Sequence, residues 1–262
     1  MIDLHSHILF GIDDGPPDLD GSLAFARAAA AAGTRTIAAT PHIDTHFNLM
    51  PGDRDAPLAA VRAAVAAEGL PLTVISGGEI DLARYLDLGE DELASLRLGD
   101  GEFLLLECPL STAAGAFDRF LSALLSRGVR MLLAHPERCP DFQRRPERLA
   151  ALVSGGALAQ VTSGSLSGRF GSTVQQASLH MLSEGLVHDI SSDAHDASRR
   201  GPDLREGLEA AAIALPGASA LADWLSMDVP GAIISGGPIP RRPPVSIPPP
   251  KKQRRGLFGR KR

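Results

Sequence analysis

Short apolar runs alternate with longer amphipathic stretches along most of this chain. The apolar runs have the length of strands and lie near residues 2–4, 36–40, 72–75, 103–106, 129–134 and 187–192. Amphipathic stretches of helical periodicity separate them, and several end at a glycine, the usual stop signal of a helix. They cover residues 22–32, 56–68, 90–96, 116–127, 146–154, 174–184, 204–215 and 218–225. Strands that alternate with helices predict an α/β fold with a parallel sheet.

Histidine or a carboxylate follows most of these apolar runs. His5 and His7 lie one residue apart, and alternate side chains of a strand point the same way. Polar groups at the ends of buried strands are costly unless they are paired or bind a metal. The later runs lead to His42, Glu79, Glu107, His135, Asp193 and His195. In a closed βα barrel such strand ends converge on one face, so we predict a distorted TIM-like (β/α)7 barrel with a metal site there.

The chain of 262 residues is 44% hydrophobic, enough to bury one large core. Its net charge of −5 is uneven, because residues 241–262 hold nine Lys and Arg and no acid. The remainder has 17 Arg against 31 Asp and Glu, a net charge of −14. We expect one domain over 1–238 and a Pro-rich, basic, disordered tail over 239–262.

The tail has the charge to bind an anionic membrane surface or an acidic protein. The acidic body argues against a nucleic acid partner. The chain has two cysteines, Cys108 and Cys139, no apolar run near the roughly 20 residues of a membrane span, and no signal segment. A cytoplasmic protein is therefore expected.

Imidazole and carboxylate without thiolate suit Mn, Fe, Zn, Co or Mg better than a structural zinc. Eight ligand candidates exceed the need of one ion, so two or three ions are expected. Ions about 4 Å apart are suited to displacement at phosphorus. Arg138 follows His135 closely, and Arg199 and Arg200 follow His195. These arginines are the candidates for binding a phosphoryl group.

The same residues resemble the polymerase-and-histidinol-phosphatase (PHP) superfamily, and within it the capsular-polysaccharide tyrosine phosphatases of the CpsB/YwqE type. The resemblance spans residue 1 to about 234. It rests on MIDLHSHILFGIDDGP at the start, followed by TPH at 40–42, GGEI at 77–80, LLLE at 104–107, AHPER at 134–138 and SDAH at 192–195. The family implies a distorted PHP-type barrel with manganese-like ions. It also implies hydrolysis of phosphotyrosine on bacterial tyrosine kinases that control exopolysaccharide synthesis.

The resemblance also implies a division of the ligands. His5, His7, Glu79 and Asp193 would hold one ion, and Glu79 would bridge to a second ion held with Glu107 and His135. His42 and His195, with Asp14, would hold a third. Asp14 would act near the nucleophile or leaving group, and Arg138 and Arg200 would bind phosphate. Three features depart from the family. Cys139 replaces a common Tyr, and the basic tail has no counterpart. Arg200 is followed by Gly201 and Pro202, and Arg199 beside it leaves two arginines for the same role.

Other functions remain open. Cys139 and Arg145 have the C-x5-R spacing of cysteine-dependent tyrosine phosphatases, but the intervening residues include Pro140 and Asp141 and no glycine. Such a loop is a poor cradle for phosphate. Within metal chemistry, the alternatives are a phosphoesterase acting on a small molecule such as histidinol phosphate, and a nuclease. A non-catalytic scaffold that recruits partners through the tail is the alternative outside enzymes.

Overall fold

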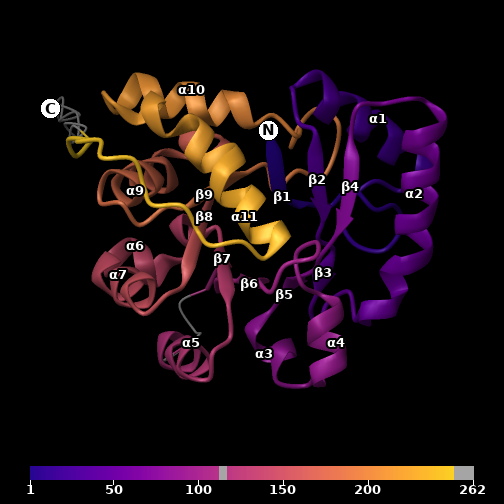
Figure 1. Ribbon diagram of the computed structural model, residues 1–262, viewed down its shortest axis with the longest axis horizontal. Helices are drawn as coiled ribbons and strands as arrows, with labels where there is room; N and C mark the ends of the chain where they lie inside the picture. Colours follow the sequence, from indigo (N-terminus) through magenta and orange to yellow (C-terminus); the bar gives the residue numbers. More distant parts are fainter. Residues whose placement is uncertain (112–116, 251–262) are drawn as a thin grey trace, which may run out of the picture.

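The computed structural model describes residues 1–111 and 117–250, with short parallel strands at the centre and helices around them (Figure 1). The strands are β1 (Ile2–Ser6), β2 (Thr36–Ala39), β3 (His42–Ile43), β4 (Thr73–Ser76), β5 (Glu79–Ile80), β6 (Leu104–Glu107), β7 (Met131–Ala134), β8 (Leu158–Thr162) and β9 (Asp189–Ser191). The α-helices are α1 (Leu19–Ala31), α2 (Asp55–Ala67), α3 (Leu82–Tyr85), α4 (Glu90–Ser95), α5 (Phe117–Ser126), α6 (Pro140–Arg144), α7 (Pro146–Ser154), α8 (Ser163–Ser167), α9 (Ser172–Ser183), α10 (Leu204–Ala214) and α11 (Val229–Ser235).

The strands form two parallel sheets. One has three strands in the order β1-β2-β4, and the other has six in the order β3-β5-β6-β7-β8-β9. The register within the larger sheet pairs Leu105 with Leu132 and Gln160 with Asp189. The predicted α/β fold with parallel strands is therefore confirmed, but within the described residues the strands do not make one closed sheet.

The two sheets are separated where two strands are interrupted by residues without regular strand structure. β2 is followed by β3 after Thr40 and Pro41, and Pro41 has no N–H to donate to a ladder. β4 is followed by β5 after Gly77 and Gly78, where side chains from elsewhere crowd the backbone. A Cβ at Gly78 would lie 2.6 Å from Leu96 Cδ2. The same two segments pair on both sides of the breaks, β2 with β4 and β3 with β5, but β1 pairs with them only before the breaks and β6 only after them.

The end of β1 lies beside the segment that follows β9. Ser6 and Ala194 form an isolated parallel bridge. His7 N donates to Ala194 O at 2.9 Å, and Asp193 N donates to His5 O at 3.0 Å. Contacts between the first and the last strand thus bring the two ends of the strand series together.

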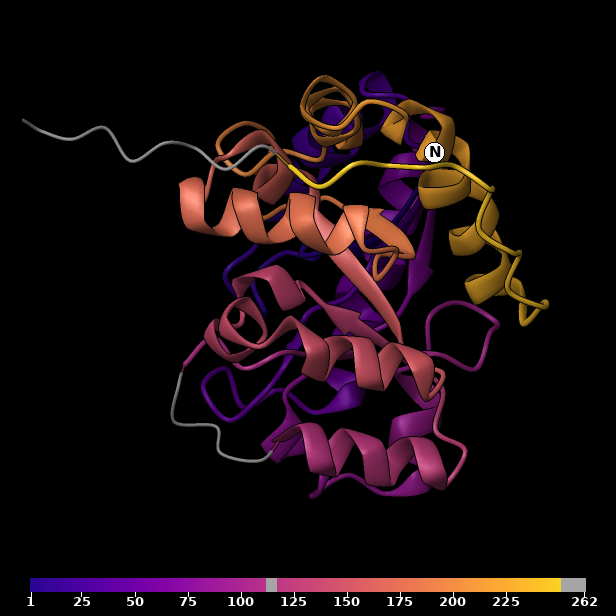
Figure 2. The same ribbon diagram turned by 90° about the vertical axis from the view of Figure 1, so that its left-hand side faces the viewer.

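The predicted helices are found with shifts of a few residues, except at the end of the body. There the stretch 218–225 is not one helix. It divides into a 3-10 turn, η4 (Ala218–Leu221), and a π turn, η5 (Trp224–Asp228), which leads into α11. Residue 116 of the predicted helix 116–127 lies outside the described residues. In Figure 2, α9, α7 and α5 lie one below another in front of the strands.

Apolar side chains of strands and helices form two cores. Phe25 and Val61 contribute to the core between the three-stranded sheet and helices α1 and α2. The larger core holds the inner residues of β6 and β7 together with Phe142, Leu179 and Trp224. Burial of this apolar surface is the main stabilising contribution to the fold.

The first part of the tail packs against the body, contrary to the expected disorder from residue 239 onwards. Ile239, Val245 and Ile247 contact the larger core. Trp224 Nε1 donates to Pro240 O at 3.0 Å, and Arg242 Nη2 donates to Leu182 O at 3.2 Å. Prolines favour an extended backbone, and the apolar side chains between them supply the contacts. Residues 251–262, where the basic tail ends, lie outside the described part of the chain.

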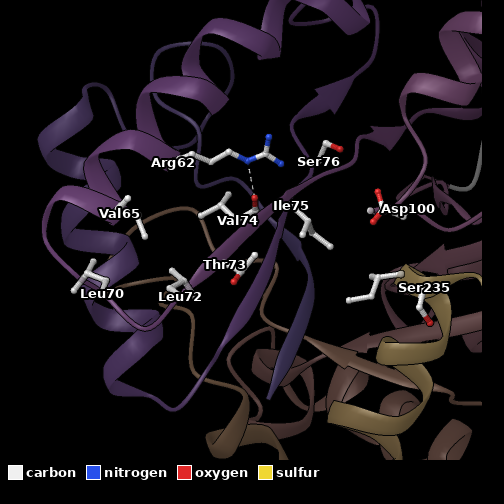
Figure 3. A pocket seen from close by; sticks show the side chains of 13 residues that line it. Arg62, Val65, Leu70, Leu72, Thr73, Val74, Ile75, Ser76, Asp100 and Ser235 are labelled. Atoms are coloured by element: carbon white, nitrogen blue, oxygen red, sulfur yellow. Dashed lines mark hydrogen bonds between the residues drawn. The ribbon is translucent and has the colours of Figure 1, made fainter.

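A groove lies between α2, the edge strand β4 and the end of α11 (Figure 3). Its wall is mainly apolar, with Val65, Leu70 and Leu72 on one side, and Arg62 Nε donates to Val74 O at 2.7 Å. The predicted metal ligands are absent from its lining. None of the helices described is both long and apolar enough to cross a membrane.

Candidate metal centre

The eight predicted ligands come together with Asp14 at one end of the strands. They do so because parallel strands present their carboxyl ends on the same face. Each ligand lies at the end of a strand, just after one, or just beyond the break in an interrupted strand. The ligand atoms form four overlapping sets, each within 4.8 Å: His5, His7 and Asp193; His5, Glu79 and His135; His42, Glu79 and Glu107; and His7, Asp14, His42 and His195.

Glu79 is the centre of this cluster. Its Oε2 lies 3.2 Å from His5 Nε2, 3.5 Å from His7 Nε2 and 3.1 Å from His42 Nδ1. Its Oε1 lies 2.8 Å from His135 Nε2. Burial opposes ionisation of Glu79, but the surrounding imidazoles outweigh it and hold the carboxyl pKa well below its ordinary value. One carboxylate thus lies next to four of the five histidines of the cluster.

Asp193 connects the histidines to the arginines. Its Oδ1 lies 3.6 Å from His5 Nε2 and 3.5 Å from His7 Nε2. Its Oδ2 accepts hydrogen bonds from Arg138 Nη1 at 2.7 Å and Arg200 Nη2 at 2.9 Å. Arg200, and not Arg199, is therefore the arginine beside the cluster. Two cationic groups stand next to the candidate ligands, as binding of an anion requires.

Asp14 lies at the more exposed side of the cluster. Its Oδ1 is 3.1 Å from His195 Nε2 and 3.6 Å from His42 Nε2. Partial burial raises the pKa of Asp14, but hydrogen bonding to His195 outweighs it and lowers the pKa to about 2. Glu107 shows the opposite behaviour, since burial and the charge of Glu79 raise its pKa to about 8. Its grouping with His42 rather than His135 differs from the division that the resemblance implied.

Unpaired buried atoms show that the cluster fits divalent ions. His5 Nε2, His7 Nε2, His42 Nδ1 and Glu79 Oε2 are buried, and none has a hydrogen-bond partner among the residues described. Buried polar atoms normally have partners, because leaving one unpaired costs about 1–3 kcal/mol. Each of these four atoms belongs to one or more of the overlapping sets, and cations held by those sets would satisfy them. Nitrogen and oxygen donors without sulfur match the ions predicted from the sequence.

Two ligand positions have a left-handed backbone. His135 has φ 35° and Asp193 has φ 48°, in a region that residues other than glycine adopt rarely. Such a conformation costs on the order of 1–3 kcal/mol and persists where the surroundings enforce it. His135 directly follows β7, Asp193 lies two residues after the end of β9, and both side chains reach the cluster.

The sequence interpretation missed residues that orient the ligands. Asp13 Oδ2 lies 2.8 Å from His7 Nδ1 and also accepts from His42 N at 3.2 Å. Gly15 lets this loop approach closely, because a Cβ there would lie 2.2 Å from His7 O. Gln160 Oε1 lies 3.0 Å from His5 Nδ1. The position of Asp13 beside Asp14 was a usable signal, whereas Gln160 had none.

Phe170 was also missed. Its ring lies under both arginines, with the centroid 4.8 Å from Arg138 Cζ and 5.9 Å from Arg200 Cζ. An aromatic face attracts a guanidinium and restricts its position. Phe170 therefore helps to keep both cationic groups near Asp193.

The structure excludes a cysteine-dependent mechanism at Cys139. The side chain is fully buried, and this burial raises the pKa of its thiol. Arg145 pairs with Asp141 instead of facing an open phosphate loop. A thiolate nucleophile needs a lowered pKa and an accessible position, so the C-x5-R spacing is a coincidence.

Comparison with known proteins agrees with this geometry. The family model for capsular polysaccharide synthesis, CpsB/CapC, matches residues 1–234. This chain belongs to the CpsB/CapC family. Within the family, the chain is similar to tyrosine-protein phosphatase YwqE of Bacillus subtilis (strain 168), with 36% identity over 215 residues, 79% of this chain and 82% of YwqE. It is 28% identical to tyrosine-protein phosphatase CpsB of Streptococcus pneumoniae over 217 residues, 80% of this chain and 88% of CpsB.

A solved structure gives the same result for the fold. It is one of the crystal structures of YwqE from Bacillus subtilis and CpsB from Streptococcus pneumoniae, which are described as unique metal-dependent tyrosine phosphatases. The likeness has a TM-score of 0.80 and 30% identity, and covers 97% of this chain and 100% of the other. CpsB/CapC membership and the α/β fold predicted from the sequence are thus confirmed.

Proposed function

We propose that this chain is a metal-dependent protein-tyrosine phosphatase that acts on a bacterial tyrosine kinase controlling exopolysaccharide or capsule synthesis. The observation that supports this most is the set of unpaired histidine and carboxylate atoms around Glu79, with Arg138 and Arg200 on Asp193 beside them. A scaffold that had lost catalysis would have no need to keep every ligand. The names of the relatives in the CpsB/CapC family agree with this chemistry.

The ions are proposed to be Mn²⁺, two or three in number, with Fe, Zn, Co or Mg as alternatives. His5, His7, His42, Glu79, Glu107, His135, Asp193 and His195 would hold them, with Asp14 at the exposed side. When bound, such ions lower the pKa of water and neutralise charge that develops at phosphorus.

The side chains supply the remaining steps. Arg138 and Arg200 bind the phosphoryl oxygens by charge-assisted hydrogen bonds and hold phosphorus in front of the ligand cluster. Asp14 is ionised, so it accepts a proton or hydrogen bond and does not act as an acid. Tyrosine has an ordinary pKa of about 10, so its phenolate leaves with little help from an acid. An alkyl phosphate such as histidinol phosphate would need more protonation, and this favours the aryl ester.

The finer architecture is also a proposal. If β2 with β3 and β4 with β5 each count as one interrupted strand, seven strands follow one another around a distorted PHP-type barrel. The bridge between Ser6 and Ala194 would then close it. We further propose that residues 1–238 form the catalytic domain and that the tail 239–262 is an appendage to it. The docked segment 239–247 would fix the point from which the basic end departs.

We propose a cytoplasmic enzyme that binds the inner face of the membrane through this basic end, near its kinase. Removal of residues 251–262 is then expected to abolish sedimentation with vesicles containing anionic phosphatidylserine and to leave turnover of a free phosphotyrosine peptide unchanged. Equal sedimentation of both proteins would contradict membrane binding through residues 251–262. The proposed phosphatase activity would be unaffected by that result.

The decisive experiment measures bound metal and hydrolysis of a phosphotyrosine peptide before chelation, after it, and after Mn²⁺ is restored. We expect two or three ions per chain, activity lost on chelation and recovered with Mn²⁺. His135→Ala should impair both, and Cys139→Ser should retain both. Faster hydrolysis of histidinol phosphate than of the peptide would instead assign a small-molecule substrate. Activity that survives chelation would refute the metal-dependent mechanism.

A further inference from the structure

Gln160 lies beneath the ligand cluster on β8 and outside the set of proposed ligands. It is fully buried, and the register of the sheet pairs it with Asp189 at the start of β9. A buried amide between two strands makes no apolar contact that a leucine would not make better. Its hydrogen bonds must therefore account for its presence.

Those hydrogen bonds form a relay from Asp189 to a ligand. Gln160 Nε2 donates to Asp189 Oδ2 at 2.6 Å, and Gln160 Oε1 lies 3.0 Å from His5 Nδ1. The partner at Asp189 sets the orientation of the amide, because the reverse orientation would place the amide oxygen 2.6 Å from the carboxylate oxygen of Asp189. The oxygen that faces His5 can only accept, so His5 Nδ1 must carry a hydrogen.

The consequence appears on the other side of the ring. With the hydrogen on Nδ1, His5 presents the lone pair of Nε2 to Glu79 Oε2 and Asp193 Oδ1, at 3.2 and 3.6 Å. These three atoms carry lone pairs and repel one another unless a cation lies between them. The relay therefore selects the tautomer in which His5 is ready to bind through Nε2.

Two other histidines of the cluster, His7 and His195, have a different kind of partner at Nδ1. A carboxylate, that of Asp13, lies at His7 Nδ1, and the backbone oxygen of Asp193 lies 3.0 Å from His195 Nδ1. A partner at the second ring nitrogen fixes the tautomer and orientation of a metal-bound histidine. The neutral amide at His5 does so without placing another negative charge next to Glu79.

We infer that Gln160, oriented by Asp189, is a positioning residue that holds His5 as an Nε2 ligand of the metal centre. This inference rests on the proposed metal centre. Loss of such an outer partner typically lowers metal affinity 10- to 100-fold.

The test compares the intact protein with Gln160→Met, which keeps the volume and removes the relay, and Gln160→Glu. In the latter the introduced carboxyl group shares one proton with Asp189, as two adjacent buried carboxyl groups do, and its other oxygen still accepts from His5. Titration of the metal-free proteins with Mn²⁺ should show affinity lowered about 10- to 100-fold at one site in Gln160→Met, and less than that in Gln160→Glu. The Tm of each metal-free protein reports folding separately.

A spectroscopic measurement does not depend on a variant that folds. In the intact protein loaded with Zn²⁺ and labelled with ¹⁵N-histidine, we expect the ring hydrogen of His5 on Nδ1 and the metal on Nε2. A hydrogen on Nε2, or equal Mn²⁺ affinity in the intact protein and a folded Gln160→Met, would overturn the relay alone. Absence of any Mn²⁺ binding by the intact protein would instead refute the proposed function.

Discussion

Two histidines near opposite ends of β9, His188 just before the strand and His7 beside the segment that follows it, lie in opposite circumstances. His188 lies one residue before the strand, where its Nδ1 accepts the N–H of Ala159 at 3.3 Å and its ring packs against Trp224. Burial lowers the pKa of His188 to about 4. Near the other end, His7 donates its backbone N–H to Ala194 O, and there the carboxylates of Asp13, Asp193 and Glu79 outweigh burial and hold the pKa of His7 well above the ordinary value.

The difference lies in the partners and not in the depth of burial. A neutral backbone partner satisfies His188 and leaves it uncharged, as expected of a histidine with a structural role. Carboxylates surround the histidines of the cluster, yet His5 Nε2, His7 Nε2 and His42 Nδ1 have no hydrogen-bond partner among the described residues. A surplus of negative charge together with unpaired nitrogens indicates a cation site.

The largest effect is expected from Glu79→Gln. The substitution removes the charge shared by His5, His42 and His135 at the centre of the cluster. Because loss of an outer partner alone costs up to about 100-fold, we expect kcat/KM on a phosphotyrosine peptide to fall by more than that, together with loss of bound Mn²⁺. Glu102→Gln, at an exposed glutamate paired with Arg130, is the matched control and should change neither. Retention of metal and near-normal activity in Glu79→Gln would show that the cluster is structural.

A smaller effect is expected from the arginines. Arg200→Ala removes one charged donor from the phosphate site, and such hydrogen bonds contribute about 1.5–3 kcal/mol. We therefore expect kcat/KM to fall about 10- to 100-fold while the Mn²⁺ stoichiometry stays the same. Arg199→Ala alters the exposed neighbour and should have no comparable effect. If the two variants behave alike, the pairing of Arg200 with Asp193 does not serve substrate binding.

His188 is expected to affect stability only. Its pKa is about 4 in the folded protein and about 6.5 in the unfolded chain. Between these values the unfolded chain binds the additional proton, so the free energy of unfolding falls as the pH is lowered from 6.5 to 4. The full loss is about 3 kcal/mol. His188→Asn retains an acceptor for Ala159 and cannot titrate, so its stability should fall less over this range.

Denaturant unfolding of both proteins at pH 7, 6, 5 and 4 measures this difference. Other groups titrate in the same range, but they do so in both proteins and cancel in the comparison. Curves that stay parallel across the range would show that His188 is charged when folded, which would remove the contrast between the two ends of β9.

Most of the ligand cluster could be predicted because each ligand is marked by its immediate neighbours in the sequence. A histidine or carboxylate directly after an apolar run needs no knowledge of the rest of the fold, and parallel strands do the rest. β8 was not identified, because Gln160 and Thr162 interrupt its apolar character. The role of Gln160 depends on Asp189 and His5, which are distant in the sequence and adjacent only after the sheet forms.

The breaks in the strands could not be predicted for a similar reason. Gly77 and Gly78 resembled an ordinary loop before Glu79. In the structure their lack of a Cβ leaves room for the side chains of Leu96 and Leu98. The tail posed the opposite difficulty. Its composition indicated disorder, and the contacts of Ile239 and Val245 with the core depend on surfaces formed by distant segments.

The smallest effect is expected from a substitution in the groove of Figure 3. It tests whether an open groove marks the functional site as well as unpaired buried atoms do. Its polar groups have partners, since Arg62 donates to Val74 O and Gly99 N donates to Ser76 O. Arg62→Ala removes one hydrogen bond, worth about 0.5–1.5 kcal/mol, and leaves the Val74 carbonyl to water. We expect a slightly lower free energy of unfolding and unchanged kcat/KM and Mn²⁺ content. A loss of activity comparable with that of Arg200→Ala would mean that the groove takes part in catalysis, and that unpaired buried atoms alone do not locate the functional site in this fold.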